Sequence, residues 1–280
     1  SIGTIANTGL DYWDSSSDGD IQYAVDGSQN LTVASGNTLL VNGNGTYAPG
    51  AGITTPGFKQ TAATFNGGSS DMTITGTFRV SGGTFNSTSG ILLMDDAASY
   101  DVSGATFNAG SGTVLFNPGT VSITGSHTLN NLTFDAAGGV GIYNIDPATT
   151  LTVNGTLTIA GDVEAYCDGG NIHAKGNVTD TNTKETNPGS IGDTMITING
   201  TGAQTLTGSG TVGEGLLPAI TINKPSGNLT LSGVISLGRD WIFTSMGTGS
   251  LVTTGSTLAF IGGASGPASI SGTHTLNNLT

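Results

Sequence analysis

The sequence predicts an all-β chain, folded as a single-stranded parallel β-helix (β-solenoid) that is right-handed and has about 20–22 residues per coil. Three observations carry this prediction: a recurring Thr-Phe-Asn triplet, apolar residues that alternate with Thr, and abundant glycine. Glycine accounts for 47 of 280 residues, well above the usual fraction of about 7%. Charged residues are only 9%, so short strands between Gly/Asn turns fit this composition better than disorder does.

The triplet gives the length of the repeating unit. It occurs in "TFNGG" at 64–68, "TFNST" at 84–88 and "TFNAG" at 106–110, so it returns after 20 and then 22 residues. Between and after these positions, stretches such as "MTITGTFRV" and "TVLF" alternate with the period of two that is typical of strands. A span of this length with two or three short strands matches one coil of a solenoid.

Stacked coils place residues one coil apart directly above each other, at the strand spacing of about 4.8 Å. The triplet therefore predicts an inward aromatic stack and a ladder of side-chain amides at one corner. The stack consists of Phe65, Phe85 and Phe107, and the ladder of Asn66, Asn86 and Asn108.

A longer repeat lies over the first. Residues 122–133 read "SITGSHTLNNLT" and residues 269–280 read "SISGTHTLNNLT", with ten of twelve positions identical. This indicates a duplicated module of several coils, in which His127 and His274 are equivalent and are expected to be structural corner groups. Since the second copy ends within the module, we expect the chain to continue past Thr280 or to be completed by another chain.

The repeat defines the expected domain organisation. Residues 1–28 lack it and are predicted to form an N-terminal cap or assembly segment, because a solenoid needs a cover over its first coil. Residues 29–280 are predicted to form the solenoid. Within it, residues 162–193 carry most of the Glu and the single Cys, and we expect an irregular projecting loop there.

Charge and cysteine content exclude several function classes. The net charge is −13, with 6 Lys and Arg against 19 Asp and Glu, whereas nucleic acids and anionic lipids require clustered basic residues. No apolar run reaches the length of a membrane helix, so membrane insertion is not expected. Cys167 is the only cysteine and cannot form an intrachain disulfide. The chain starts at Ser1 without a signal peptide, which implies a processed chain or a fragment.

One acidic segment is a candidate metal site. "DSSSDGDI" at 14–21 partly resembles an EF-hand calcium loop, which predicts Asp14, Ser16, Asp18 and Asp20 as calcium ligands. The expected acidic residue at position twelve of the loop is replaced by Val25, with Asp26 one place late. A solvated acidic turn is the alternative interpretation.

Other polar groups are candidates for catalysis. Asp95, Asp96 and Asp101 could serve as acid and base in a β-helix polysaccharide hydrolase, but the pattern favours a solvated corner. A lyase would need a basic residue beside a carboxylate, and Arg79 and Arg239 occupy unrelated strand contexts. Cys167 and His173 lack the second pair of ligands that zinc requires. No catalytic residue is therefore predicted.

The segments "GTVLFN…VSITGSHTLNNLTFDAAGG" and "ITINGTGAQTLTGSGTV…AITINKPSGNLTLSG" resemble the repeats of very large bacterial surface proteins. These are similar to the Thr/Gly/Asn-rich parallel β-helices of autotransporter and haemagglutinin-type adhesins. The resemblance covers most of residues 29–280. It implies export, a cell-surface or extracellular location and a structural or adhesive role, and it carries over no catalytic residues.

Together these observations predict a structural, non-enzymatic module of an extracellular filament, stalk or surface adhesin. It would act as a stiff rod that associates end to end into a fibre or forms part of a larger chain. No cofactor is expected other than the candidate calcium ion, and surface glycans are the candidate ligands. The alternatives are a carbohydrate-active β-helix enzyme and a carbohydrate- or calcium-binding adhesin.

Overall fold

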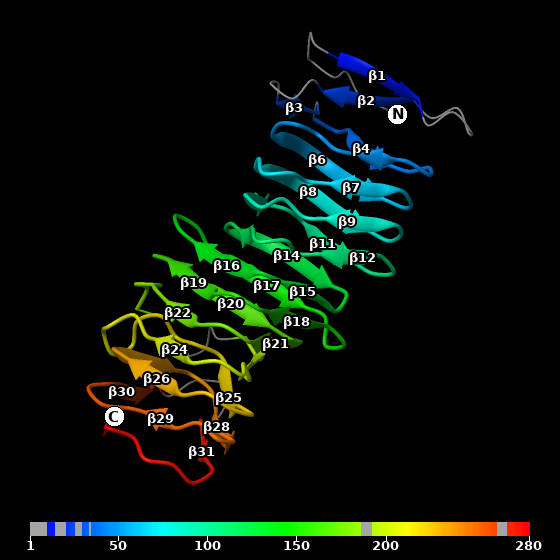
Figure 1. Ribbon diagram of the computed structural model, residues 1–280. Helices are drawn as coiled ribbons and strands as arrows, with labels where there is room; N and C mark the ends of the chain where they lie inside the picture. The colour runs from blue at the N-terminus through cyan, green and yellow to red at the C-terminus, as the bar shows by residue number, and fades with distance from the viewer. Residues whose placement is uncertain (1–9, 15–20, 26–29, 34, 186–191, 262–267) are drawn as a thin grey trace. The chain divides into compact units, whose positions relative to one another are not determined.

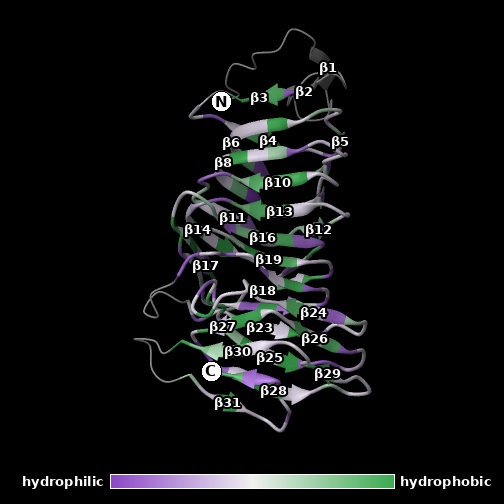
Figure 2. Cartoon of the chain, turned by 90° about the vertical axis from the view of Figure 1, so that its left-hand side faces the viewer, coloured by the Kyte–Doolittle hydropathy of each residue, from purple (hydrophilic) through white to green (hydrophobic). Residues whose placement is uncertain are grey.

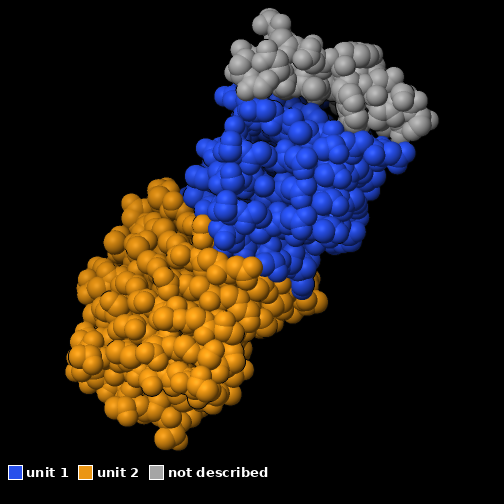
Figure 3. All heavy atoms as spheres, in the orientation of Figure 1, with its two compact units in different colours: residues 1–130 blue, residues 131–280 orange. Residues whose placement is uncertain are grey.

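The computed structural model describes residues 10–14, 21–25, 30–33, 35–185, 192–261 and 268–280. The described residues form β-strands and turns without any helix. They fall into two compact units, residues 1–130 and 131–280 (Figure 3). Apart from one antiparallel pair near the start of unit 1, each unit consists of parallel strands stacked as a β-solenoid, with about 11 turns over the two units together. The predicted fold class is therefore confirmed.

Unit 1 contains the first fifteen strands. They are β1 (Leu10–Asp14), β2 (Ile21–Val25), β3 (Leu31–Thr32), β4 (Thr38–Val41), β5 (Thr46–Tyr47), β6 (Ile53–Gln60), β7 (Thr64–Asn66), β8 (Met72–Val80), β9 (Thr84–Asn86), β10 (Ile91–Met94), β11 (Ser99–Val102), β12 (Thr106–Asn108), β13 (Thr113–Phe116), β14 (Gly119–Thr124) and β15 (His127–Leu129).

Parallel pairing in unit 1 follows the triplet. Strands β7, β9 and β12 lie one above another (Figure 1), with Phe65 opposite Phe85 and Phe85 opposite Phe107. The long strand β8 pairs with β6 on one side and with both β10 and β11 on the other. Side chains alternate between the core and the surface along these strands, as the period of two requires.

A glycine makes one corner of unit 1 compact. Gly125 follows β14 with φ +91°, a left-handed conformation that residues with a Cβ rarely adopt. A Cβ there would lie 1.8 Å from the carbonyl oxygen of Val102 in the previous turn. Only glycine therefore allows the two turns to approach this closely.

Unit 2 contains the remaining strands. They are β16 (Asn131–Ala136), β17 (Gly141–Ile145), β18 (Thr150–Val153), β19 (Leu157–Gly161), β20 (Ala165–Asp168), β21 (Asn171–Ala174), β22 (Val178–Asp180), β23 (Met195–Ile198), β24 (Gln204–Thr207), β25 (Ala219–Asn223), β26 (Leu229–Ser232), β27 (Val234–Leu237), β28 (Trp241–Ser245), β29 (Leu251–Val252), β30 (Thr257–Phe260), β31 (Ile270–Ser271) and β32 (Asn278–Leu279).

The turns of unit 2 vary more in length than the triplet suggests. Leu132 pairs with Leu157, 25 residues later, whereas Val178 pairs with Leu206, 28 residues later. The strands stay short and in register, so the additional residues lie in the corners. Figure 2 shows hydrophobic residues, coloured green, recurring along the strands of both units.

The structure differs from the prediction over residues 162–193. Instead of an irregular projecting loop, residues 162–185 contain β20, β21 and β22, which pair in parallel with β17, β18 and β19. The acidic residues that suggested a loop lie mostly at corners or on outward positions, which strands tolerate. Residues 186–191 lie outside the described part of the chain.

The predicted N-terminal segment, residues 1–28, contains the antiparallel pair β1 and β2, in which Leu10 lies opposite Val25. The proposed calcium ligands Ser16, Asp18 and Asp20 lie outside the described residues. The backbone of Asp14 ends β1.

Candidate functional site

The Thr-Phe-Asn corners of unit 1 bring an aromatic stack together on the inside. The ring centroids of Phe65 and Phe85 are 4.9 Å apart with an interplanar angle of 8°, and those of Phe85 and Phe107 are 5.3 Å apart at 17°. Phe85 is 0% exposed, whereas Phe107 is half-buried. Parallel in-register pairing places equivalent rings one strand spacing apart, so the stack follows directly from the triplet.

A second aromatic stack runs beside the first. Phe58 stacks on Phe78 at 5.3 Å, and Phe78 stacks on Tyr100 at 5.0 Å. Phe78 also meets Phe85 edge to face at 5.2 Å, which joins the two stacks. The core of unit 1 is therefore a continuous aromatic assembly.

The asparagines of the same triplets form a chain of amide hydrogen bonds. Asn86 Nδ2 donates to Asn66 Oδ1 at 2.5 Å, and Asn108 Nδ2 donates to Asn86 Oδ1 at 2.7 Å. Each amide has both a donor and an acceptor, so identical side chains one turn apart can satisfy one another. This arrangement is a brace between turns and offers no reactive group.

His127 lies where the two aromatic stacks converge. Its ring centroid is 4.8 Å from that of Phe107, and the Tyr100 hydroxyl is 2.9 Å from its Nε2. Its Nδ1 is 2.8 Å from the carbonyl oxygen of Gly125. A carbonyl only accepts, so Nδ1 carries the proton and Nε2 accepts from Tyr100. Burial lowers the pKa of His127 to about 4.

His274, the equivalent residue in the second copy of the twelve-residue segment, has a similar environment. Trp241 Nε1 donates to His274 Nε2 at 3.0 Å, and the Phe243 ring stacks on the imidazole at 4.8 Å and 19°. Burial again lowers the pKa of the histidine. In both copies a neutral imidazole accepts a hydrogen bond from an aromatic donor in an earlier turn, which is a structural role.

Acidification should therefore destabilise unit 1 partly through His127. The unfolded histidine takes up a proton near pH 6.5 and the native one near pH 4, so this stability is complete above pH 6.5 and is lost as the pH falls toward 4. The loss is at most about 3 kcal/mol. Urea unfolding at pH 7 and pH 4.5 should show a larger drop for wild type than for His127→Gln. Equal drops in both proteins would contradict this assignment, since the carboxylates are common to both.

The three candidate acidic residues have separate environments. Asp95 Oδ1 accepts from Asn117 Nδ2 at 2.8 Å, and Asp101 forms an ion pair with Arg79 at 3.3 Å. Asp96 is exposed at a corner with φ +53°. No hydrogen bond among the described residues joins any two of these carboxylates. The geometry therefore shows no paired acid and base at this corner.

Cys167 and His173 do not form a site together. Cys167 is buried in β20, and burial raises the pKa of its thiol to about 12, which makes it a poor nucleophile and ligand. His173 lies in β21 on the outward position between the buried residues Ile172 and Ala174. Among the described residues, no group of three or more His, Cys, Asp or Glu could hold a metal ion.

Unit 2 contains a buried lysine that the sequence did not indicate. Lys224 is 1% exposed, and its Nζ donates to the carbonyl oxygens of Gly200 at 2.8 Å and Gly202 at 3.0 Å, and to Gln204 Oε1. Burial lowers its pKa. The ammonium thus satisfies inward-facing carbonyls at one corner of the preceding turn, a requirement that any buried bend must meet.

Gln204 does the same one turn earlier. Its Nε2 donates to the carbonyl oxygens of Ala174, at 3.1 Å, and of Gly176. In unit 1, Gln60 is fully buried and donates to the carbonyl oxygens of Ala63 at 3.2 Å and Thr84 at 3.0 Å. Long polar side chains therefore fill the corners in both units.

Asn and Asp side chains also connect consecutive turns on the outside. In each case a side-chain oxygen accepts from a backbone N–H in the next turn, which would otherwise lack a partner at the start of a strand. The pairs are Asn30 with Gly52, Asp71 with Ile91, Asn131 with Thr156, Asn177 with Thr205, and Asn228 with Ser250, at 2.8–3.0 Å.

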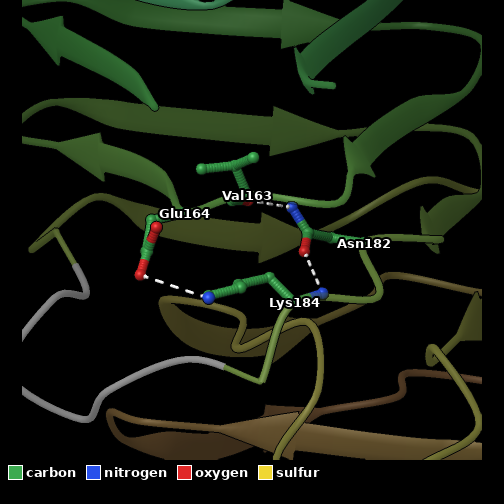
Figure 4. Close-up of polar contacts among 4 residues, drawn as sticks. All are labelled: Val163, Glu164, Asn182 and Lys184. Atoms are coloured by element: carbon green, nitrogen blue, oxygen red, sulfur yellow. Dashed lines mark hydrogen bonds and ion pairs between the residues drawn. The ribbon is translucent and has the colours of Figure 1, made fainter. Parts of the chain in front are cut away.

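A further polar cluster lies near the end of β22 (Figure 4). Asn182 Nδ2 donates to the Val163 carbonyl oxygen at 2.9 Å, and Asn182 Oδ1 accepts from the backbone N–H of Lys184 at 2.8 Å. Lys184 Nζ is 3.9 Å from a carboxylate oxygen of Glu164. The cluster ties the corner after β22 to the corner before β20.

Comparisons of the chain with protein-family models, curated protein sequences and solved structures find no match. Within the described residues, no helix is long and apolar enough to span a membrane.

Proposed function

We propose that this chain is a structural module of an extracellular filament, stalk or surface adhesin. The observation that carries the proposal is that each turn bonds to the next one, through strand pairing, aromatic stacking and side-chain hydrogen bonds. Such contacts join only neighbouring turns, so they add along the stack and give a stiff element. The proposal assigns no catalytic residue and no cofactor.

The surface chemistry supports this role. Outward positions carry mainly Thr, Ser and Asn, and the net charge is −13, which favours solubility and opposes nonspecific binding to nucleic acid or anionic lipid. The resemblance of the repeats to those of bacterial surface adhesins supports the location outside the cell. In this proposal the module either associates end to end with other copies or forms part of a longer chain.

Immunoelectron microscopy of native material tests the proposal. Antibodies against the recombinant chain should label filaments, stalks or the cell envelope, and labelling should disappear when the antibody is first absorbed with the chain. Diffuse label inside the cell would overturn the proposal. Labelling of soluble secreted particles without an extended structure would favour a secreted enzyme instead.

One observation favours glycan binding as a second candidate function. In unit 1 an open cavity of about 240 Å³ is lined largely by polar residues, including Asn30, Thr54, Ser70, Asp71 and Thr73. Hydroxyl, amide and carboxylate groups are the hydrogen-bonding partners that sugars use. A glycan array should then show a ligand whose binding is reduced at least about tenfold by Thr54→Val and is unchanged by Thr152→Val in unit 2. Binding that both variants retain would place the ligand elsewhere.

A further inference from the structure

Unit 2 buries a carboxyl group that has no charged partner among the described residues. Asp180 is 1% exposed, and it lies opposite the core residue Ile159 in the parallel register. Its Oδ1 accepts from the backbone N–H of Asn182 at 3.0 Å, whereas its Oδ2 is buried and has no hydrogen-bond partner in the described part of the chain. An ionised carboxylate is strongly disfavoured in such a place. Burial therefore raises the pKa of Asp180 well above the usual value and favours its neutral form.

Residues 209–216, here called the cover segment, lie over this carboxyl. Gly215 has φ +57°, and a Cβ at this position would be 2.4 Å from Asp180 Oδ2. The Gly215 N–H donates to the Lys184 carbonyl oxygen at 3.1 Å, and the Gly213 N–H donates to Ser236 Oγ at 3.0 Å. The cover segment is thus in close contact with Asp180, and hydrogen bonds to Lys184 and Ser236 hold it in place.

The packing beside the carboxyl leaves almost no room for solvent. A cavity of only about 10 Å³ is lined by Ile159, Ala165, Asn182, Gly215 and Leu216, which is about the space of one water molecule. An ionised Asp180 needs several hydrogen-bond donors or water molecules. A movement of Gly215 away from Asp180 would admit these water molecules.

Other charged groups lie on the elements that surround Asp180. They are Glu164 before β20, Lys184 and Glu185 after β22, and Glu214 in the cover segment. Lys184 pairs with Glu164, and no ion pair among the described residues involves Asp180. Glu185 and Glu214 lie opposite each other in an antiparallel bridge, so their repulsion is the competing source of pH dependence.

We propose that the cover segment is a pH-sensitive latch, which is closed over the neutral Asp180 carboxyl and opens when this carboxyl ionises. Opening exposes Leu216 and the interior of the corner between β22 and β24. The unfolded or open state loses its proton near the ordinary pKa of Asp, about 4, and the closed state does so at higher pH. Closure is therefore complete at low pH and weakens as the pH rises. This inference does not depend on the proposed structural function.

Hydrogen–deuterium exchange of the whole chain at pH 5 and pH 9, corrected for intrinsic exchange rates, tests the latch. In wild type, protection of the Gly213 and Gly215 amides should be lower at pH 9, by about tenfold for each pKa unit by which the closed-state titration lies above pH 5. Asp180→Asn keeps the acceptor for Asn182 but cannot ionise, so its protection should be the same at both pH values. Gly215→Ala should leave the segment unprotected at both.

The control variant is Glu214→Gln, which removes the competing repulsion and should retain the wild-type pH dependence. The proposal is overturned if wild-type protection does not change with pH, or if Asp180→Asn keeps the change while Glu214→Gln abolishes it. If Asp180→Asn does not fold, carbon NMR titration of Asp180 in wild type decides. An ordinary Asp titration there would overturn the latch, and a titration at raised pH together with loss of protection would support it.

Discussion

Replacing Phe85 with alanine should lower the free energy of unfolding of unit 1 by about 3–5 kcal/mol. The Phe85 side chain is fully buried and contacts rings on every side: Phe65 at 4.9 Å, Phe78 at 5.2 Å, Phe107 at 5.3 Å and Phe58 at 5.5 Å. Removing it loses the burial of the ring and leaves a cavity where both aromatic stacks meet. Urea unfolding followed by circular dichroism measures the loss.

Phe107→Ala is the matched control, because Phe107 occupies the same place in the next triplet but is half-buried. Its ring contacts Phe85 on one side and His127 on the other. We expect a clearly smaller loss of stability, on the order of 1–2 kcal/mol. Equal losses for the two variants would mean that the joined stacks do not determine the stability of unit 1.

Replacing Lys224 with methionine should destabilise unit 2 by about 2–4 kcal/mol, although the two side chains have similar length. Methionine cannot donate, so the carbonyl oxygens of Gly200 and Gly202 and the Oε1 of Gln204 lose a buried donor. A buried acceptor without a partner costs about 1–3 kcal/mol. Part of this cost is offset because the methionine variant no longer has to bury an ammonium group. Thermal and urea unfolding both report the difference.

Lys175→Met is the control for this experiment. Lys175 lies at the corresponding corner two turns earlier, but it is exposed, and its Nζ donates to the Asn199 carbonyl oxygen at 3.3 Å. Exposed substitutions of this kind change stability by about 0.5 kcal/mol or less. If Lys224→Met were as stable as Lys175→Met, the buried ammonium would have no stabilising role at that corner.

The regular part of unit 1 was predictable because one local signal specifies it. In a parallel stack the sequence spacing of equivalent residues equals the turn length, so the triplets at 64, 84 and 106 fix the register of β7, β9 and β12. In unit 2 the corners have unequal lengths. No repeated triplet indicates the register there, and pairing is decided by which apolar residues can be buried together.

The buried polar groups were less accessible to sequence reasoning. Asp180 is two residues after Val178, and the period of two in "NVTD" places both side chains inward. The sequence therefore contained a pattern that indicates the burial of Asp180. The acidic composition of the surrounding residues led instead to the prediction of a loop. Lys224 and Gln204 carry no such signal, because their partners are backbone carbonyls in other turns, and any residue supplies a carbonyl.

The repeated use of a histidine acceptor has a consequence for how such chains can diversify. The twelve-residue segment contributes the same imidazole nitrogen in both copies, while the donor is a tyrosine hydroxyl in one and an indole N–H in the other. Both copies of the segment therefore contact an earlier turn through the same hydrogen-bond acceptor. Both copies also pack the imidazole against a phenylalanine ring, Phe107 in one and Phe243 in the other. A duplicated copy is therefore compatible with different earlier turns, provided that they present one aromatic donor and one ring to the histidine.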